Sequence, residues 1–277
     1  RSDRREGSGM SDYVPFNEYL AAPGYGSGAL RQALRSLSHL HHYRITSGEP
    51  PSPSQMLGSA THCAVLEPRA FHDRYAQWSG DRRTKAGKEA YSEFIACNAN
   101  KEILTAEQYE TAWAMADTLL AMPEYRALIS NHGQPAVEVS RFWEDTPTSV
   151  PLKARADMLL DDAGVDLKTA SDASPRGFAA AAARYGYHIQ AAMYCEAFKR
   201  DKFAFVAIEN RPPFCAGIYW LDEASLELGR QLYREAVVKA SWYHFGQDSW
   251  RAGYGEHDMQ LPNWAFAEQE DDLEVTL

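Results

Sequence analysis

The sequence lacks several features that mark common classes of protein. Its four cysteines form no CxxC pair, so neither a zinc knuckle nor an iron–sulfur cluster is indicated. No apolar run approaches the roughly 20 residues needed to span a membrane, and no signal peptide is recognisable. We therefore expect no membrane partner, a cytoplasmic location and cysteines that stay reduced.

An excess of positive charge is also missing, because 28 basic residues stand against 38 acidic ones and the net charge is −10. This balance argues against a generic nucleic-acid coat. It does not exclude an enzyme that meets DNA in a local groove, since net charge averages over the whole surface. The basic residues are unevenly placed: residues 81–88 carry four of them against one acid, whereas residues 266–277 form an acidic tail.

A length of 277 residues suits one large domain that buries its core without disulfides. We expect residues 1–10 to be the remnant of an expression tag, with Met10 as the native start. Residues 11–265 are predicted to form a single domain. Its helical N-terminal part covers residues 26–122, and a core containing strands covers residues 135–246.

Hydrophobic periodicity places the elements. Helices are predicted over residues 27–42 with Ser27 as N-cap, 55–67 with Ser54 as N-cap, 86–100, 106–121 (ended by Pro123), 176–199 and 222–244. Strands are predicted over residues 136–143, 152–160, 165–168, 203–209 and 215–221, with another near residues 75–78. This order predicts one α/β domain with a mixed sheet and a helical N-terminal extension.

The stretch from Lys153 to Thr169 reads as two strands joined by a turn over residues 161–164. Alternation along the second strand puts Asp166 and Lys168 on the same face. Asp157 lies nine residues upstream of Asp166. Two carboxylates can hold a hard cation such as Mg²⁺, and the lysine can orient a water or neutralise a phosphate. From spacing alone, a surface hairpin with an incidental ion pair remains equally open.

Asp157 followed by Asp166-Leu167-Lys168 resembles the PD-(D/E)XK nuclease signature. The chain around it, over roughly residues 25–265, resembles the RecE-type phage recombination exonucleases, which are related to lambda-type exonuclease and to RecB nuclease domains. The resemblance implies a restriction-endonuclease-like core, in which helices flank a central mixed β-sheet. Residues 135–246 would then be the catalytic core of a nuclease domain.

The resemblance also implies a metal site. Gly58 to Pro68 is similar to the family's Gly-x-x-x-His helix, which supplies an imidazole ligand, here His62; read alone, His62 suits a hydrogen-bonded core residue. The other ligands would be Asp157, Asp166 and the backbone carbonyl of Leu167, holding Mg²⁺, for which Mn²⁺ can substitute. Arg155-Ala156-Asp157 departs from the family's usual Arg-Pro-Asp.

Further residues follow from the same resemblance. Lys168 would hold the attacking water or stabilise the transition state, or else simply pair with Asp166. Gln190 and Tyr194 match a Gln-x-x-x-Tyr motif that orients the phosphate and the lysine, although without the family they read as core packing. Glu138 would be a further metal-site residue, with a structural or indirect role at least as well supported. The expected catalytic residues are Asp157, Asp166, Lys168, Gln190 and Tyr194.

The residues expected to contact DNA or its 5′-phosphate are Ser27, Arg31, Arg35, Arg155, Arg82, Arg83, Lys85 and Lys88. Residues 27–30 resemble the family's Ser-x-x-Leu segment, and a helix N-terminus favours anions. A plain N-cap explains Ser27 as well, and a solvated loop explains residues 81–88 equally well. Residues 250–254 and 261–265 resemble the family's closing segment.

The implied activity is that of a Mg²⁺-dependent exonuclease that acts 5′ to 3′ on linear double-stranded DNA and leaves 3′ overhangs for a single-strand annealing protein. The resemblance also implies a homo-oligomeric ring, a trimer or a tetramer, in the cytoplasm of a bacterial host. One alternative is a related DNA repair nuclease of different polarity. Another is a non-catalytic DNA-binding scaffold for recombination, against which the retained Asp157, Asp166 and Lys168 argue.

Overall fold

The computed structural model describes residues 14–46, 48–132, 135–246, 256 and 258–261. The predicted tag remnant, the acidic tail and nearly all of the predicted closing segment lie outside these residues. Among the described helices, none is long and apolar enough to cross a membrane.

The helices are α1 (Phe16–Ala21), α2 (Ser27–Arg35), α3 (Leu37–Thr46), α4 (Pro53–Leu66), α5 (Phe71–Arg74), α6 (Lys85–Cys97), α7 (Ala106–Ala121), α8 (Pro123–Asn131), α9 (Pro175–Tyr185), α10 (Tyr187–Phe198) and α11 (Glu223–His244). The strands are β1 (Tyr75–Trp78), β2 (Glu102–Thr105), β3 (Ala136–Glu144), β4 (Pro151–Leu159), β5 (Ala163–Ala170), β6 (Lys202–Glu209) and β7 (Ala216–Trp220).

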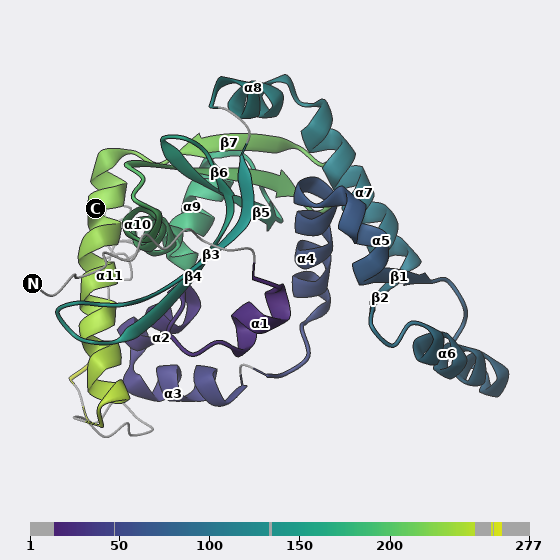
Figure 1. Ribbon diagram of the computed structural model, residues 1–277, viewed down its shortest axis with the longest axis horizontal. Helices are drawn as coiled ribbons and strands as arrows, with labels where there is room; N and C mark the ends of the chain where they lie inside the picture. The colour runs from purple at the N-terminus through teal and green to yellow at the C-terminus, as the bar shows by residue number, and fades with distance from the viewer. Residues whose placement is uncertain (1–13, 47, 133–134, 247–255, 257, 262–277) are drawn as a thin grey trace, which may run out of the picture.

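The central sheet has five strands in the order β3-β4-β5-β6-β7. Neighbours are antiparallel except β5 and β6, which are parallel. Helices α9, α10 and α11 cover one face of this sheet, and α4 and α7 cover the other (Figure 1). The predicted α/β fold with a mixed, helix-flanked sheet is confirmed.

Strand β6 lies at the centre of both hydrophobic layers. Phe203 and Phe205 face the cluster that includes α10 and α11, whereas Ala204 and Val206 face the cluster that includes α4 and α7. The continuously apolar sequence of β6 therefore reflects burial on both faces, as predicted.

The β4–β5 hairpin opens shortly after its turn. Leu160 N–H donates to the Ala163 carbonyl at 2.9 Å, so the turn is shorter than predicted and Ala163 already begins β5. The two strands then pair at two positions, the last being Met158 with Val165. One step further along this register, Asp157 would face Asp166, and like charges directly opposite each other destabilise a sheet.

Where β4 no longer pairs with β5, a segment from the N-terminal part of the chain lies along the free edge of β4. Tyr25 forms a parallel bridge with Leu152 on this edge. Helix α1 precedes Tyr25, and its last turn receives the Lys153 ammonium, which donates to the carbonyls of Tyr19, Leu20 and Ala22 at 2.7–3.0 Å. The opening between β4 and β5 thus lies beside α1.

Two predicted helices are each divided in two. The helix predicted over residues 27–42 breaks at Ser36, whose extended backbone separates α2 from α3. Ser27 is the first residue of α2 and not its N-cap, because Gly26 occupies that position. The helix predicted over residues 176–199 breaks at Gly186, which adopts a left-handed φ of 65°. Glycine takes this conformation without the steric cost of a Cβ.

Other boundaries also shift. Ser52, rather than Ser54, caps α4, and it forms a capping box with Gln55. Pro123 does not only end α7 but begins α8, an element that the sequence prediction missed. Proline suits a first helical position because no amide hydrogen is needed there.

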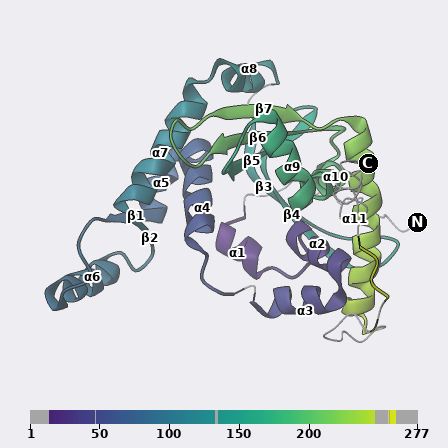
Figure 2. The same ribbon diagram turned by 180° about the vertical axis from the view of Figure 1, so that it is seen from behind.

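Strands β1 and β2 form a separate parallel pair that leads to α6. Figures 1 and 2 show α6 projecting from the rest of the molecule, and none of its residues is buried. We call residues 75–105 the arm. It carries the basic segment 81–88.

Candidate active site

The opening between β4 and β5 is lined by polar side chains from several elements. They are His62 of α4, Glu138 of β3, Asp157 of β4, Asp166 and Lys168 of β5, and Gln190 of α10. Segments far apart in the sequence are therefore brought to one place by the sheet and the two helices that cover its opposite faces.

One side of the site is a cluster of possible metal donors. A nitrogen of His62 and one carboxylate oxygen each of Glu138 and Asp157 lie within 4.8 Å of one another. His62 Nδ1 is 3.3 Å from Asp157 Oδ2, which also accepts a 2.7 Å hydrogen bond from Leu167 N–H. This bond across the opening fixes Asp157 where the strand ladder has ended.

The other side of the site is centred on Asp166, which is 2% exposed. Gln190 Nε2 donates to its Oδ1 at 2.6 Å. The Lys168 ammonium contacts its Oδ2 and lies 4.9 Å from the centre of the Tyr187 ring. Tyr194 lies one turn further along α10 and is 7% exposed; burial is the main cause that raises its pKa, and the charges of Asp166 and Asp157 add to it. The predicted residues of β5 and α10 thus lie together.

The charges in the site are strongly coupled. Burial is the largest single influence and would lower the pKa of His62, but Asp157 and Asp166 together outweigh it and raise that pKa to about 9. Burial opposes ionisation of Asp157, yet His62 holds its pKa below the ordinary value. Burial raises the pKa of Asp166 to about 6, against the opposing effect of Lys168. At neutral pH, a metal ion therefore has to displace a proton from His62.

The donor set fits a divalent cation. One imidazole and two carboxylates converge, and Asp166 Oδ2 is buried without a hydrogen bond of regular geometry despite its contact with Lys168. Mg²⁺ takes a few carboxylates and completes its shell with water or phosphate, and carboxylate oxygens also suit Mn²⁺. Glu138, whose role the sequence left open, lies within this cluster together with His62 and Asp157. The ligand roles of Asp166 and the Leu167 carbonyl stay predictions.

Arg155 is buried, whereas its predicted contact with DNA would require an exposed guanidinium. It is 6% exposed and donates to Glu138 Oε2 at 2.5 Å, to Ser140 Oγ at 2.7 Å and to the Val14 carbonyl at 2.6 Å. The Arg155 guanidinium therefore makes its hydrogen bonds within the protein, to residues of β3 and to the segment before α1.

The other predicted DNA contacts lie on two separate surfaces. Ser27 is half-buried at the start of α2, Arg31 Nη1 donates to the Tyr185 carbonyl, and Arg35 is exposed beside Gln32. The basic residues of the second group are all exposed and lie on the arm, away from the site (Figures 1 and 2): Arg82, Arg83, Lys85 and Lys88. Their roles stay predictions.

One residue near the site was missed by the sequence analysis. Tyr19 of α1 lies beside Arg155, whose Cζ is 5.9 Å from the Tyr19 ring centre. The segment before Gly26 is rich in turn residues and six-residue α1 has no buried position, so periodicity gave no signal for it.

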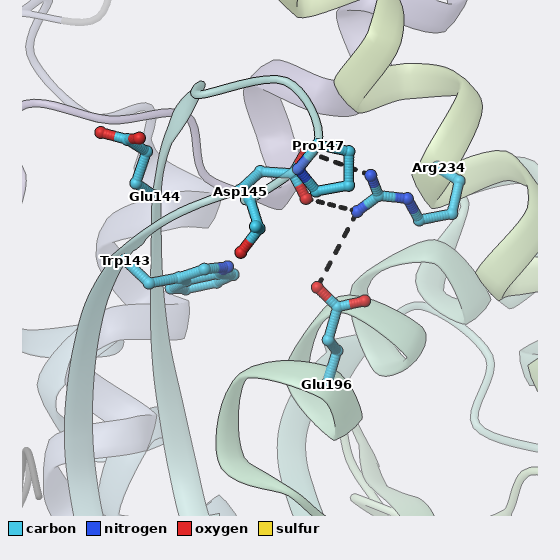
Figure 3. A pocket seen from close by; sticks show the side chains of 7 residues that line it. Trp143, Glu144, Asp145, Pro147, Glu196 and Arg234 are labelled. Atoms are coloured by element: carbon cyan, nitrogen blue, oxygen red, sulfur yellow. Dashed lines mark hydrogen bonds and ion pairs between the residues drawn. The ribbon is translucent and has the colours of Figure 1, made fainter. Parts of the chain in front are cut away.

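A pocket elsewhere on the molecule is not part of this site. It lies at the β3–β4 turn, where Arg234 of α11 pairs with Asp145 at 2.6 Å and points toward Glu196 beside Trp143 (Figure 3). Asp145 and Glu196 both pair with Arg234, whereas Glu144 points away from them (Figure 3). The Arg234–Asp145 ion pair connects α11 to the turn of the β3–β4 hairpin.

Comparison with known families gives a match over residues 30–250 to DUF3799, described as a PDDEXK-like domain of unknown function. The chain belongs to this family. The predicted PD-(D/E)XK recognition is thereby confirmed for most of the chain. No curated protein matches the sequence.

Solved structures of similar fold include a crystal structure named "Putative exonuclease" from Eubacterium rectale. It is 12% identical, with a TM-score of 0.62, and the match covers 97% of this chain and 100% of the other. At this identity the likeness concerns the fold. Two weaker matches are a phage related exonuclease from Haemophilus somnus 129PT (10% identity, 82% and 97% coverage, TM-score 0.36) and the alkaline exonuclease LHK-Exo from Laribacter hongkongensis (14%, 68% and 90%, 0.30).

Proposed function

We propose that this protein is a divalent-metal-dependent exonuclease that acts on the ends of linear double-stranded DNA. The observation that carries the proposal is the opening between β4 and β5. There, a possible metal site of His62, Glu138 and Asp157 lies next to the buried Asp166–Lys168 pair. Membership of a PDDEXK-like family and the likeness in fold to a protein named as an exonuclease support it.

Mg²⁺, or Mn²⁺ in its place, would be held by His62, Glu138 and Asp157, with Asp166 and the Leu167 carbonyl as further candidates. The ion would supply Lewis-acid activation of the phosphodiester and of the attacking water. The carboxylates of Glu138 and Asp157 would neutralise the charge of the cation and fix its position.

Lys168 and Gln190 have complementary roles in this proposal. The Lys168 ammonium, held by Asp166, stabilises negative charge that develops on the phosphate and orients the water. Gln190 keeps the Asp166 carboxylate in place through its 2.6 Å hydrogen bond, and Tyr194 lies buried on the next turn of α10. Contacts to phosphate carry no sequence information, so the enzyme needs no preferred sequence.

The finer features rest on the resemblance to RecE-type exonucleases. We propose 5′-to-3′ polarity, production of 3′ single-stranded overhangs, an annealing protein as partner, and a ring of three or four copies. Phosphate binding near Ser27 and Arg31 would provide the anchor for a 5′ end.

Linear duplex DNA labelled at either the 5′ or the 3′ end tests activity and polarity together. Purified protein is incubated with each duplex in Mg²⁺ or in EDTA, and released nucleotides are followed over time. We expect release from the 5′ label first, in Mg²⁺ only. Earlier release from the 3′ label would contradict the polarity. DNA binding without any release would favour the scaffold function.

A further inference from the structure

The buried guanidinium of Arg155 connects three parts of the chain. Its side chain is 5% exposed and reaches Glu138 and Ser140 on β3 as well as the Val14 carbonyl before α1. The rings of Phe16 and Tyr19 cover it, with centres 5.7 and 5.9 Å from its Cζ. Its remaining nitrogen, Nη2, is buried without a partner. No nitrogen is therefore offered to a ligand in solvent.

The backbone at Glu138 needs support. Glu138 has a φ of 54°, in the left-handed region that residues with a Cβ rarely adopt. Its neighbours Val137 and Val139 pair regularly with β4, so the departure is confined to one residue. Such conformations persist where surrounding contacts fix them, and they concentrate at functional sites.

Arg155 is placed to give that support. It faces Ser140 in the sheet register, one diagonal step from Glu138, within reach of a long side chain. The planar guanidinium binds both residues of β3 at once, at 2.5 and 2.7 Å. It thereby fixes the direction of the Glu138 carboxylate relative to His62 and Asp157.

The charge of Arg155 also helps to hold the Glu138 carboxylate in the cluster. Glu138 and Asp157 bring two carboxylates together in one cluster, and like charges this close repel each other. The Arg155 guanidinium, 2.5 Å from Glu138 Oε2, offsets that repulsion.

We propose that Arg155 is a positioning residue that holds Glu138 as a ligand of the metal site, with the segment Val14–Ala21 closing the space behind it. The inference rests on the proposed function, because it concerns the same metal site. It replaces a role in DNA contact with one inside the protein, and it makes α1 a part of the metal site's support.

Isothermal titration of Mn²⁺ into the full-length protein without DNA tests this role. We expect Arg155→Met, which keeps most of the buried volume, to weaken Mn²⁺ binding by about 10- to 100-fold, as removal of an outer partner of a ligand does. Arg155→Lys keeps the charge but not the two-pronged hydrogen bonding, and is expected to fall between Arg155→Met and the parent. Glu138→Gln with Arg155→Met should bind Mn²⁺ no more weakly than Glu138→Gln alone.

Arg234→Met is the matched control. Arg234 also pairs with a carboxylate, Asp145 at 2.6 Å, but at the far end of the same hairpin (Figure 3). It should lower the melting temperature and leave Mn²⁺ affinity unchanged, which separates a general loss of stability from positioning.

Several outcomes would overturn the inference. They are parent-like Mn²⁺ affinity in Arg155→Met, equal weakening in Arg234→Met, or a double variant weaker than Glu138→Gln. If Arg155→Met does not fold, parent-like affinity in Arg155→Lys would overturn it in the same way. A parent that binds no Mn²⁺ would contradict the metal site itself, whereas a parent that binds Mn²⁺ but leaves DNA intact would contradict only the proposed function.

Discussion

At the scale of single residues, the site is defined by carboxylates that the sheet cannot pair. Asp157 and Asp166 would face each other if the β4–β5 ladder continued, and instead the ladder ends at Met158. Asp157 then pairs with His62, and Asp166 with Lys168. Each buried charge has a partner of opposite sign, which offsets the cost of burial.

The coupling of His62 to Asp157 predicts a pH dependence of metal binding. The pKa of His62 is raised to about 9, so its imidazole is protonated at pH 7 and must lose that proton to become a ligand. Affinity for Mn²⁺ should therefore rise with pH, by up to about tenfold per unit, and level off above the pKa of His62. Titrations in buffers of different ionisation enthalpy should detect a proton released at pH 7. Affinity independent of pH between 6 and 9 would contradict His62 as a ligand.

Not all residues of the site were equally visible in the sequence. The alternation of side chains along one strand predicts that Asp166 and Lys168 lie on the same side of the sheet. The spacing of Gln190 and Tyr194 along one helix predicts that these two residues lie on the same side of that helix. The contact of Glu138 with Arg155 depends on the register between β3 and β4 and on an unusual φ, neither of which sequence periodicity determines. The support from Tyr19 depends on docking of a helix too short and too exposed to be recognised.

At the scale of elements, the break between α9 and α10 directs Tyr187 and Gln190 toward β5. Gly186 is both the C-cap of α9 and the N-cap of α10. The Ala-rich sequence on both sides favours one long helix, and that is why a continuous helix was predicted. Gly186 is the local signal that the prediction did not use.

Gly186→Ala should therefore destabilise the protein. A Cβ would lie 3.1 Å from Arg31 Cδ and Ile189 Cδ1, in addition to the cost of about 1–2 kcal/mol for alanine in a left-handed conformation. Urea denaturation followed by circular dichroism measures the change. Gly246→Ala is the matched control, because Gly246 has a similar φ but nothing within 4 Å of an added Cβ. Equal losses of stability in the two variants would contradict the importance of the packing at Gly186.

At the scale of the whole molecule, an acidic protein must present positive charge locally to bind DNA. The net charge is −10, yet the arm carries four exposed basic residues just before and within the first turn of α6. Long-range attraction of DNA to such a segment is screened by salt within about 10 Å at 0.1 M. The arm can therefore contribute to DNA binding only where it touches the duplex.

Replacing Arg82, Arg83, Lys85 and Lys88 with Gln tests the arm. We expect weaker binding of duplex DNA and a salt dependence reduced by roughly 0.9 in log–log slope for each phosphate that the arm no longer neutralises. Mn²⁺ binding should be unchanged, because the arm lies away from the site (Figure 1). Fluorescence anisotropy over a series of salt concentrations provides both values. Unchanged affinity and slope would mean that the arm is only a solvated surface.

The central claim is that the opening between β4 and β5 is a nuclease active site, and Lys168→Ala tests it most directly. The rate of nucleotide release from linear duplex DNA in Mg²⁺ is compared with that of the parent and of Lys202→Ala, a matched variant whose lysine pairs with Asp162 in the turn between β4 and β5. We predict that Lys168→Ala lowers the rate by about 10²- to 10³-fold, as removal of one charge-stabilising group does, while Lys202→Ala keeps the parent rate. Equal rates for Lys168→Ala and the parent would contradict the claim.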